Sequence, residues 1–428
     1  MKLSTALSSW IVSSGALVWS ASASAINDYD NKIQTEEEDL ELLFERWRVR
    51  HGKTYSLGND NHNGNDNGND DNDDAVRAAA AAEYSFRKGI FRQNAAIVAN
   101  HNAAYEEGYT SYTMSVDGPF ADLTDDEFQS LYLMQPQNCS ATHVSSGPVP
   151  RKTTTTTTTT TESSSEQPLP EYVDWRTKGV LTHVKNQGNC GSCWTFSTTG
   201  TLEAHTCIEA KKDCTHWKGL AEQQLVDCAG DFNNNGCNGG LPSQAFEYIR
   251  FNGGIMTEDS YNYTAKDGIC RQMNDNDSKH IGAKVVDVFN ITSYDEDEIV
   301  TAVAGFGPVS VAYQVSPNFR FYSHGVYDSW NATTNQTQCQ KDPSHVNHAV
   351  VAVGYGTTMD DKALPFYIIR NSWGNTWGME GHFWMLRGQN LCGISDCASF
   401  PLVPSSLAPS SSIFSAEKAQ QHLRASIV

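Results

Sequence analysis

One short segment of the sequence, VKNQGNCGSCWTFSTTG at 184–200, holds two cysteines that could do chemistry. Cys190 and Cys193 could be a redox pair of the thioredoxin type, or one structural cysteine beside one nucleophile. The residues after Cys193 read as a helix, and the dipole and unpaired N–H groups at a helix N-terminus stabilise a thiolate. The chain has 11 cysteines. A structural Cys190 bonded elsewhere would explain this odd number by leaving Cys193 as an unpaired nucleophile.

A thiolate that attacks a carbonyl group needs a histidine to pair with it and to protonate the leaving group. Of the 13 histidines, His348 stands directly before an apolar strand, AVVAV, which would hold its ring at a rigid strand end. Asn371 follows a second apolar strand and could orient the imidazole, while Trp373 could shield the pair from water. The oxyanion of acyl transfer would be held by the Cys193 N–H and the Gln187 amide.

These segments together resemble the papain-like cysteine protease family. YVDWR, NQGNCGSCW, GCNGG, NHAVVAVGYG and RNSWGNTWG follow that family's order between Pro170 and Val403, and CGSCW is its local signature. The resemblance implies an α+β fold with two lobes, a helical lobe that carries Cys193 and a β-barrel-like lobe that carries His348 and Asn371. It implies a cysteine peptidase that hydrolyses peptide bonds and needs neither a cofactor nor a metal.

The resemblance also assigns roles to individual positions. The catalytic roles pass to Gln187, Cys193, His348 and Asn371. The substrate-binding residues implied by the family, together with the anchor discussed below, are Gly239, Gly240, Trp373 and Thr142. Glycines suit an edge where an extended peptide approaches the backbone closely.

The first 134 residues are predicted to be a secretory signal peptide, 1–25, and an inhibitory propeptide, 26–134. Helical patterns occur at 36–57 and again after residue 74. Between them, the insert 58–74 has no apolar side chain and is expected to be disordered. The second helical pattern is similar to the propeptide helix of this family at these positions: Glu83, Arg87, Ile90, Phe91, Asn94, Val98 and Asn102.

The eight residues QPQNCSAT, 135–142, resemble the mini-chain that cathepsin H-type members of this family keep in the cleft through a disulfide. The resemblance implies an aminopeptidase in which the Thr142 carboxylate anchors the free α-amine of the substrate. It also implies four disulfides: Cys190–Cys237, Cys228–Cys270, Cys339–Cys392 and Cys139–Cys397. Cys207 and Cys214 lie outside that pattern, and a local Cys207–Cys214 bridge would leave Cys193 as the free thiol.

The remaining organisation follows from composition. A Thr/Ser-rich linker is expected at 143–168, a peptidase domain at 169–403 and a tail at 404–428. A net charge of −20 argues against nucleic acid as a partner, and the absence of a long apolar run after the signal predicts no membrane span. The expected partners are peptide or protein substrates and the chain's own propeptide as an inhibitor, with a monomer after maturation.

The predicted route is secretory, ending in a lysosome, a vacuole or outside the cell. Six sequons agree with this route: Asn138, Asn262, Asn276, Asn290, Asn331 and Asn335.

Four alternatives stay open at this point. The first is an endopeptidase of the same fold without a retained mini-chain. The second is a non-catalytic binding or storage protein, which the filled catalytic positions disfavour. A disulfide oxidoreductase would need a bond between Cys190 and Cys193. A zinc site has little support, because no second close pair of Cys or His complements CGSC.

Overall fold

The computed structural model describes residues 39–55, 70–139, 168–271 and 279–404. It divides into two compact units, 1–84 and 85–428, and each is described by itself. The predicted signal peptide, the tail from residue 405 and nearly all of the linker lie outside the described residues. Among the residues described, no helix is both long and apolar enough to cross a membrane.

In the first unit, residues 39–50 are helical and a turn follows at 51–52, so the predicted helix is shorter than its sequence pattern. Phe44 packs edge-on against Tyr84, with 5.5 Å between ring centroids, and Tyr84 donates a 2.6 Å hydrogen bond to Glu45. Helix α2 (Asp70–Glu106) begins inside the insert that was expected to be disordered. That expectation is wrong for 70–74, because an Ala-rich run follows and each residue added to a helix gains a hydrogen bond.

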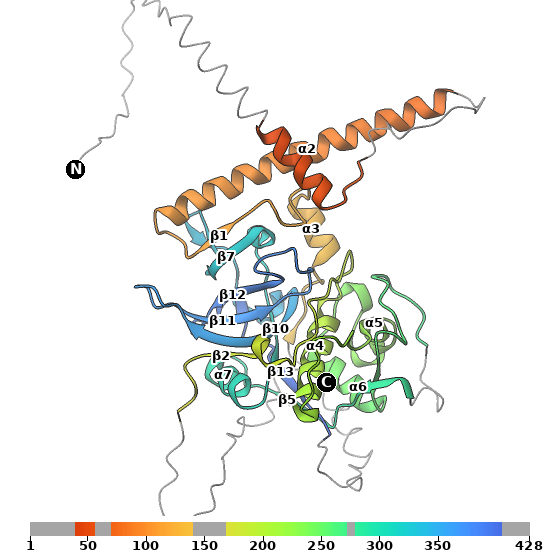
Figure 1. The fold of residues 1–428 in the computed structure, drawn as a ribbon, viewed down its shortest axis with the longest axis vertical. Helices are drawn as coiled ribbons and strands as arrows, with labels where there is room; N and C mark the ends of the chain where they lie inside the picture. Colours follow the sequence, from red (N-terminus) through yellow and green to blue (C-terminus); the bar gives the residue numbers. More distant parts are fainter. Residues whose placement is uncertain (1–38, 56–69, 140–167, 272–278, 405–428) are drawn as a thin grey trace, which may run out of the picture. The chain divides into compact units, whose positions relative to one another are not determined.

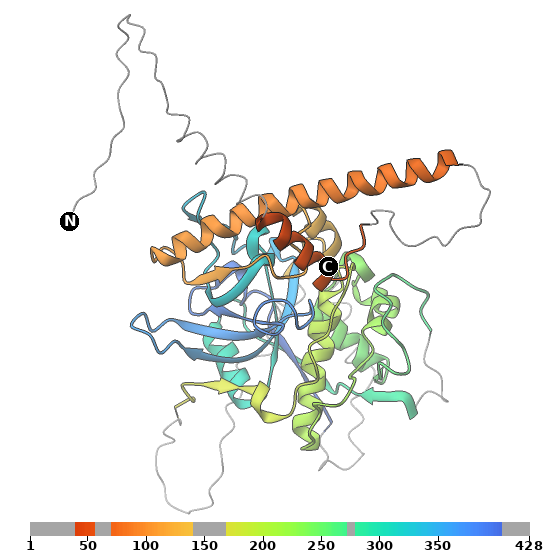
Figure 2. The same ribbon diagram turned by 45° about the horizontal axis from the view of Figure 1, so that its top comes forward.

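The second unit begins within α2 and has a helical lobe beside a mixed β-sheet (Figure 1). Its main helices are α3 (Asp125–Tyr132), α4 (Cys193–Ala210), α5 (Glu222–Cys228), α6 (Pro242–Phe251) and α7 (Glu296–Gly305). Helix α4 is buried over most of its length, as its mostly uncharged sequence requires. Figures 1 and 2 both show α4, α5 and α6, in green, on one side of the blue strands.

The large sheet has nine strands in the order β1-β7-β12-β11-β10-β6-β13-β5, and β2 pairs with β10. They are β1 (Tyr112–Met114), β2 (Val173–Asp174), β5 (Asp287–Asn290), β6 (Val309–Tyr313), β7 (Tyr322–Tyr327), β10 (His348–Thr357), β11 (Pro365–Arg370), β12 (His382–Leu386) and β13 (Ser399–Leu402). Two short ladders complete the fold: β3 (Ile255–Met256) with β4 (Ile281–Ala283), and β8 (Trp330–Asn331) with β9 (Gln336–Thr337). The α+β architecture predicted from the sequence is confirmed.

Strand β1 comes from the predicted propeptide and pairs antiparallel with β7. Tyr112 lies opposite Gly325, whose φ is +92°, and a Cβ atom at Gly325 would stand 2.4 Å from the Ser111 carbonyl oxygen. Only a glycine allows this approach without movement of one backbone. The propeptide thus extends the sheet of the region that it is expected to inhibit.

Ten of the eleven cysteines form disulfides, and Cys193 is the one free thiol. The pairs are Cys139–Cys397, Cys190–Cys237, Cys207–Cys214, Cys228–Cys270 and Cys339–Cys392. Because Cys190 is bonded to Cys237, the structure does not contain the Cys190–Cys193 bond that an oxidoreductase would need.

Candidate active site

Cys193 is the first residue of α4, and its side chain is fully buried. Its Sγ accepts a 3.4 Å hydrogen bond from the Ala349 N–H. Burial raises the pKa of the Cys193 thiol to about 12, although backbone N–H groups of Ala349, Trp194 and Met134 act in the opposite direction. The sequence predicted a stabilised thiolate here. In this form of the protein the thiol is neutral, because the loss of water outweighs the donors at the helix start.

His348 is the first residue of β10, directly before the Ala349 that contacts the thiol. Its Nε2 lies 2.8 Å from the Asn371 Oδ1, which also accepts from the Ser372 N–H. An amide oxygen only accepts, so the proton is on Nε2 and Nδ1 is left as the base. Nδ1 has no hydrogen-bond partner among the described residues. Burial lowers the pKa of His348 to about 4, although the bond to Asn371 acts to raise it.

Trp373 covers this pair. Its ring centroid lies 4.7 Å from that of His348, and only 1% of the residue is exposed. Two propeptide rings pack edge-on against the indole, Phe120 at 5.4 Å and Phe128 at 5.3 Å. The indole therefore shields the imidazole from water, as the sequence suggested, and the propeptide covers the indole in turn.

Gln187 is held on both ends of its side-chain amide. Its Oε1 accepts a 2.7 Å bond from the Ser372 hydroxyl, and its Nε2 donates 2.8 Å bonds to the carbonyls of Cys190 and Tyr132. Tyr132 is the last residue of propeptide helix α3. The amide predicted to hold the oxyanion is thus occupied by a propeptide carbonyl.

The segment after α3 crosses the cleft between the two lobes. Its backbone N–H groups bond both sides: Met134 to the Asn347 carbonyl at 3.1 Å, Gln135 to that of Asn238 at 2.9 Å, and Gln137 to that of Val346 at 2.8 Å. Such main-chain pairing on two sides is how an extended peptide binds along a cleft.

The two predicted substrate-binding glycines, Gly239 and Gly240, have different neighbours. A Cβ atom at Gly239 would stand 2.8 Å from the Met134 Cβ, so Gly239 lets the segment approach. A Cβ atom at Gly240 would instead meet Asn234 at 2.4 Å and Trp194 at 2.8 Å. A side chain at position 240 would therefore point into the helical lobe. Gly240 has none, and this allows Asn234 and Trp194 to pack closely there.

The predicted mini-chain is anchored at its cysteine. Cys139 is fully buried and bonded to Cys397, which is 2% exposed, with 5.5 Å between their Cα atoms. Cys139 belongs to the same buried apolar cluster as Met134 and Cys193. Thr142, the predicted anchor for the substrate amine, lies outside the described residues.

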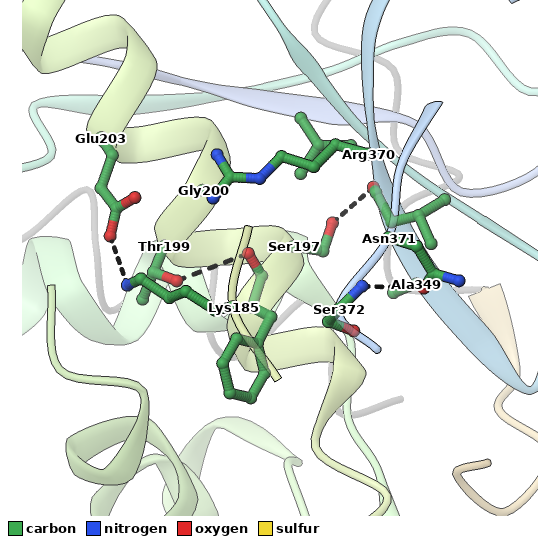
Figure 3. Close-up of a pocket in the computed structure, with 12 residues that line it drawn as sticks. Lys185, Ser197, Thr199, Gly200, Glu203, Ala349, Arg370, Asn371 and Ser372 are labelled. Carbon is green, nitrogen blue, oxygen red and sulfur yellow. Dashed lines mark hydrogen bonds and ion pairs between the residues drawn. The ribbon is translucent and has the colours of Figure 1, made fainter. Parts of the chain in front are cut away.

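A buried group of charges behind the site was not found from the sequence. Lys185 contacts Glu203 at 2.7 Å and Glu222 at 2.6 Å, and both carboxylates are at most 1% exposed. Figure 3 shows Lys185 and Glu203 in a small interior pocket with Arg370, the residue before Asn371. Charged residues usually lie on the surface. The available signal was Glu203 within the otherwise uncharged start of α4.

The propeptide also binds through charged and polar contacts within the second unit. Asp125, the first residue of α3, forms an ion pair with Arg320, a guanidinium that is 1% exposed. Within the propeptide itself, Arg87 of α2 pairs with Glu127 of α3 at 2.8 Å. The Ser111 N–H donates a 2.9 Å bond to the Asp328 carboxylate, beside the β1–β7 ladder.

The six sequons differ in exposure. Asn138, Asn262 and Asn335 are exposed, Asn290 is half-buried, and Asn276 lies outside the described residues. Asn331 is 7% exposed, and its Oδ1 accepts from the N–H groups of Thr333 and Thr334. A glycan needs a surface asparagine, so burial argues against Asn331 as an acceptor. Over the described parts of the chain, no group of three or more His, Cys, Asp and Glu has a metal-site arrangement.

Comparison with protein-family models and known proteins gives consistent results. Residues 169–402 match the model of the papain family cysteine protease, and residues 44–128 match the cathepsin propeptide inhibitor domain (I29). The chain is 44% identical over 361 residues to pro-cathepsin H of Bos taurus, covering 84% of this chain and 89% of the relative. It is 46% identical over 362 residues to the thiol protease aleurain-like of Arabidopsis thaliana, covering 85% and 84%.

A solved structure with the same fold is the digestive procathepsin L 3 of Tenebrio molitor larval midgut. The TM-score is 0.65 at 30% sequence identity, over 85% of this chain and 99% of that one. A recombinant stem bromelain precursor matches with a TM-score of 0.63 at 28% identity, over 86% and 100%.

Proposed function

Since the chain belongs to the papain family of cysteine proteases and carries the inhibitory propeptide of a zymogen, we propose that its mature form is chiefly an aminopeptidase. In this proposal the peptide 135–142 stays in the cleft after the rest of the propeptide has been removed. Endopeptidase activity would then be residual, because the peptide blocks one side of the cleft.

The proposed chemistry uses four residues. The Cys193 thiolate attacks the scissile carbonyl, and the Cys193 N–H and the Gln187 amide bind the resulting oxyanion. His348 carries the proton from the thiol to the leaving amine and then removes a proton from the water that hydrolyses the acyl-enzyme. The 2.8 Å bond to Asn371 orients the imidazole throughout. Departure of the Met134 segment would readmit water and allow the thiolate–imidazolium pair to form.

The observation that carries the aminopeptidase proposal is the buried disulfide between Cys139 and Cys397, which belongs to the same buried apolar cluster as Cys193. A free octapeptide would leave the cleft, because ordering its backbone costs about 1–2 kcal/mol per residue. A covalent tether makes binding intramolecular and raises the effective concentration of the peptide. The contact of Gln137 with Val346 shows that this segment already pairs with the cleft wall in the zymogen.

Selectivity would come from charge. Cleavage after Thr142 creates a carboxylate that can pair with the α-amine of the substrate, in a cleft that excludes water. Removing one partner of such a pair costs roughly 2–5 kcal/mol. At 1.4 kcal/mol per decade this corresponds to about 30-fold to several-thousand-fold preference for a free N-terminus.

The test compares the matured enzyme on two fluorogenic arginine amides, one with a free α-amine and one with that amine acylated. We expect strong preference for the free amine. The double variant Cys139→Ser/Cys397→Ser should lose this preference and gain activity on the blocked substrate. Cys207→Ser/Cys214→Ser removes a disulfide elsewhere and should keep the preference. Equal cleavage of both substrates by the unaltered enzyme would refute the retained peptide.

The catalytic assignment has its own test. Cys193→Ala should abolish hydrolysis of both substrates while the zymogen keeps its fold, measured by circular dichroism. Hydrolysis that persists in Cys193→Ala would exclude the mechanism.

The second candidate is an endopeptidase with an open cleft, and the fold shared with procathepsin L 3 favours it. In that case QPQNCSAT is displaced or discarded, and the blocked amide is cleaved at least as well as the free one. The route through the secretory pathway to a lysosome, a vacuole or the exterior remains part of the proposal. Glycans at the exposed Asn138, Asn262 and Asn335 would support this route, and mass spectrometry of the secreted zymogen would detect them.

A further inference from the structure

The hydroxyl group of Tyr263 joins the two segments that carry the proposed oxyanion donors. It donates a 2.7 Å hydrogen bond to the backbone carbonyl of Gln187, whose side-chain amide is one of these donors. A phenol has a single O–H proton, so the 2.6 Å contact with the Ser192 hydroxyl is donated by Ser192. Ser192 directly precedes Cys193, whose N–H group is the other donor. One side chain is thus bonded to both segments.

Ser192 is the N-cap residue of α4, yet among the described residues its hydroxyl caps no N–H group of the helix. A serine at this position usually accepts from the N–H group of the second or third helical residue. Here the fully buried hydroxyl is directed to Tyr263 and, at 3.5 Å, to the Cys190 carbonyl. It therefore does not compete for the Trp194 N–H, which together with the Cys193 N–H contacts the thiol.

Tyr263 is itself held in place by its neighbours. Its N–H group donates a 2.8 Å bond to the Glu258 carboxylate, and Thr264 donates to the Gln223 side chain at 2.9 Å and 3.0 Å. The phenol ring packs edge-on against Phe196 of α4, with 4.9 Å between ring centroids. Burial raises the pKa of Tyr263, so the hydroxyl keeps the proton that it donates. A group that orients others needs a fixed position of this kind.

We propose that Tyr263 is a positioning residue that fixes the spacing of the two oxyanion donors, the Gln187 amide and the Cys193 N–H group. It acts through the two segments to which its hydroxyl is bonded, not by contact with the substrate. This inference rests on the proposed acyl-transfer chemistry, but not on a retained peptide in the cleft. Both donors must reach the same oxygen, so loss of the hydroxyl should affect the charged intermediate more than substrate binding.

The first variant is Tyr263→Phe, which removes the hydroxyl and keeps the ring against Phe196. It also keeps the Asn262 sequon, so any glycan there is the same in both proteins. For the matured enzyme we expect kcat to fall about tenfold with KM little changed, the effect of one hydrogen bond.

This result is independent of the aminopeptidase proposal. The ratio of activities on the free and acylated arginine amides should be the same in Tyr263→Phe and the unaltered enzyme, because the hydroxyl is not part of the Thr142 anchor. Failure of the aminopeptidase proposal would change this ratio in the unaltered enzyme and would leave the fall in kcat as it is.

Tyr261→Phe is the matched control for folding. Tyr261 lies in the same segment between β3 and β4, and its hydroxyl donates a 2.7 Å bond to the Asp227 carboxylate. Both variants lose a tyrosine hydroxyl bond and should lower Tm, but only Tyr263→Phe should lower kcat. An equal fall in kcat for both variants, or no fall for Tyr263→Phe, would overturn the proposal.

A reversible inhibitor separates positioning from a general effect on the cleft. When leucinal binds, its carbonyl carbon bonds to the Cys193 sulfur and the thiol proton passes to its oxygen, which then lies at the oxyanion site. Leucinol cannot form this bond. Each is used with its α-amine free or acylated, to match the preferred substrate. Tyr263→Phe should weaken inhibition by leucinal about tenfold and leave inhibition by leucinol unchanged, whereas equal weakening of both would contradict positioning.

A second variant tests the same contact from its other side. Ser192→Ala removes the hydroxyl that donates to Tyr263, and it removes no helix cap. Its kcat should fall as well. The double variant Tyr263→Phe/Ser192→Ala should lose no more than Tyr263→Phe alone, because Ser192 acts through Tyr263. Losses in kcat that multiply would show that the two residues act independently, and the proposal would then be wrong.

Discussion

The side-chain amide of Gln187 donates a 2.8 Å hydrogen bond to the carbonyl of Tyr132 in the propeptide. The bond between His348 and Asn371 is formed at the same time, also at 2.8 Å. In the zymogen the amide proposed as the oxyanion donor is therefore occupied while the His348–Asn371 bond is in place, and the Nδ1 of His348 forms no hydrogen bond with Cys193 among the described residues. Four predictions follow from contacts of this kind.

Loss of the oxyanion donor should reduce kcat. For Gln187→Ala we expect kcat of the matured enzyme to fall about 10²–10³-fold with KM little changed, because the amide acts mainly on the charged intermediate. Steady-state kinetics on the unblocked arginine amide would measure this. Gln389→Ala, at an exposed glutamine, is the control. A loss of kcat below tenfold would contradict the assigned role.

The rate at which Cys193 is alkylated should show that its thiol is neutral in the zymogen. Burial holds the pKa of Cys193 at about 12 and that of His348 at about 4, so between these values neither group is charged. The rate of Cys193 labelling by iodoacetamide should therefore be low at pH 5–8 and rise about tenfold per pH unit above that range. After maturation, labelling at pH 5 should become fast. Equal labelling of zymogen and mature enzyme at pH 5 would show that the propeptide does not control the thiol.

The ion pair between Asp125 and Arg320 should stabilise the inhibited form. Asp125→Asn leaves a buried guanidinium without its carboxylate, which costs about 1–3 kcal/mol, so self-processing should become about tenfold faster. Asp126→Asn changes the neighbouring, exposed residue and should process at the original rate. Time courses of zymogen cleavage at pH 5 measure the processing rates of both variants. Equal rates would show that this ion pair does not contribute to inhibition.

Acid should lower the folding stability of the propeptide by protonating His101. Its ring is buried and bonded to the Tyr112 carbonyl at 3.0 Å, and burial lowers its pKa below the ordinary 6.5. The unfolded propeptide then binds a proton that the folded one does not, so stability present above pH 6.5 is lost as the pH falls through this value. His101→Gln keeps an N–H donor and should shift the pH midpoint of self-processing downward.

The control for this prediction is His324→Gln, at an exposed histidine, which should leave the midpoint unchanged. Parallel pH profiles for the unaltered zymogen and His101→Gln would show that another group senses the acid.

Local patterns in the sequence were enough to place the centre of the site. Cys193 does begin a helix, His348 begins a strand and Asn371 directly follows one, since apolar runs fixed these elements. The charge of the thiol was not predictable in this way. It depends on the complete burial of Cys193 in a cluster built from segments far apart in the chain.

Other features depended on tertiary packing alone. Nothing in its local sequence indicates that Arg320 is buried, because its partner Asp125 lies far from it in the chain and belongs to the propeptide. The same holds for Lys185, whose two carboxylates come from separate helices. Pairing of the three-residue strand β1 with β7 has no local signal either, since short strands are fixed by their neighbours.

The β1–β7 ladder has a consequence for the mature enzyme. Removal of the propeptide takes away β1, and β7 becomes the outer strand of the large sheet, with β12 on its other side. An outer strand offers unpaired N–H and C=O groups to any extended chain, including a second copy of the enzyme. In the zymogen β1 covers this edge of β7, and maturation exposes the edge in the same step that opens the active site.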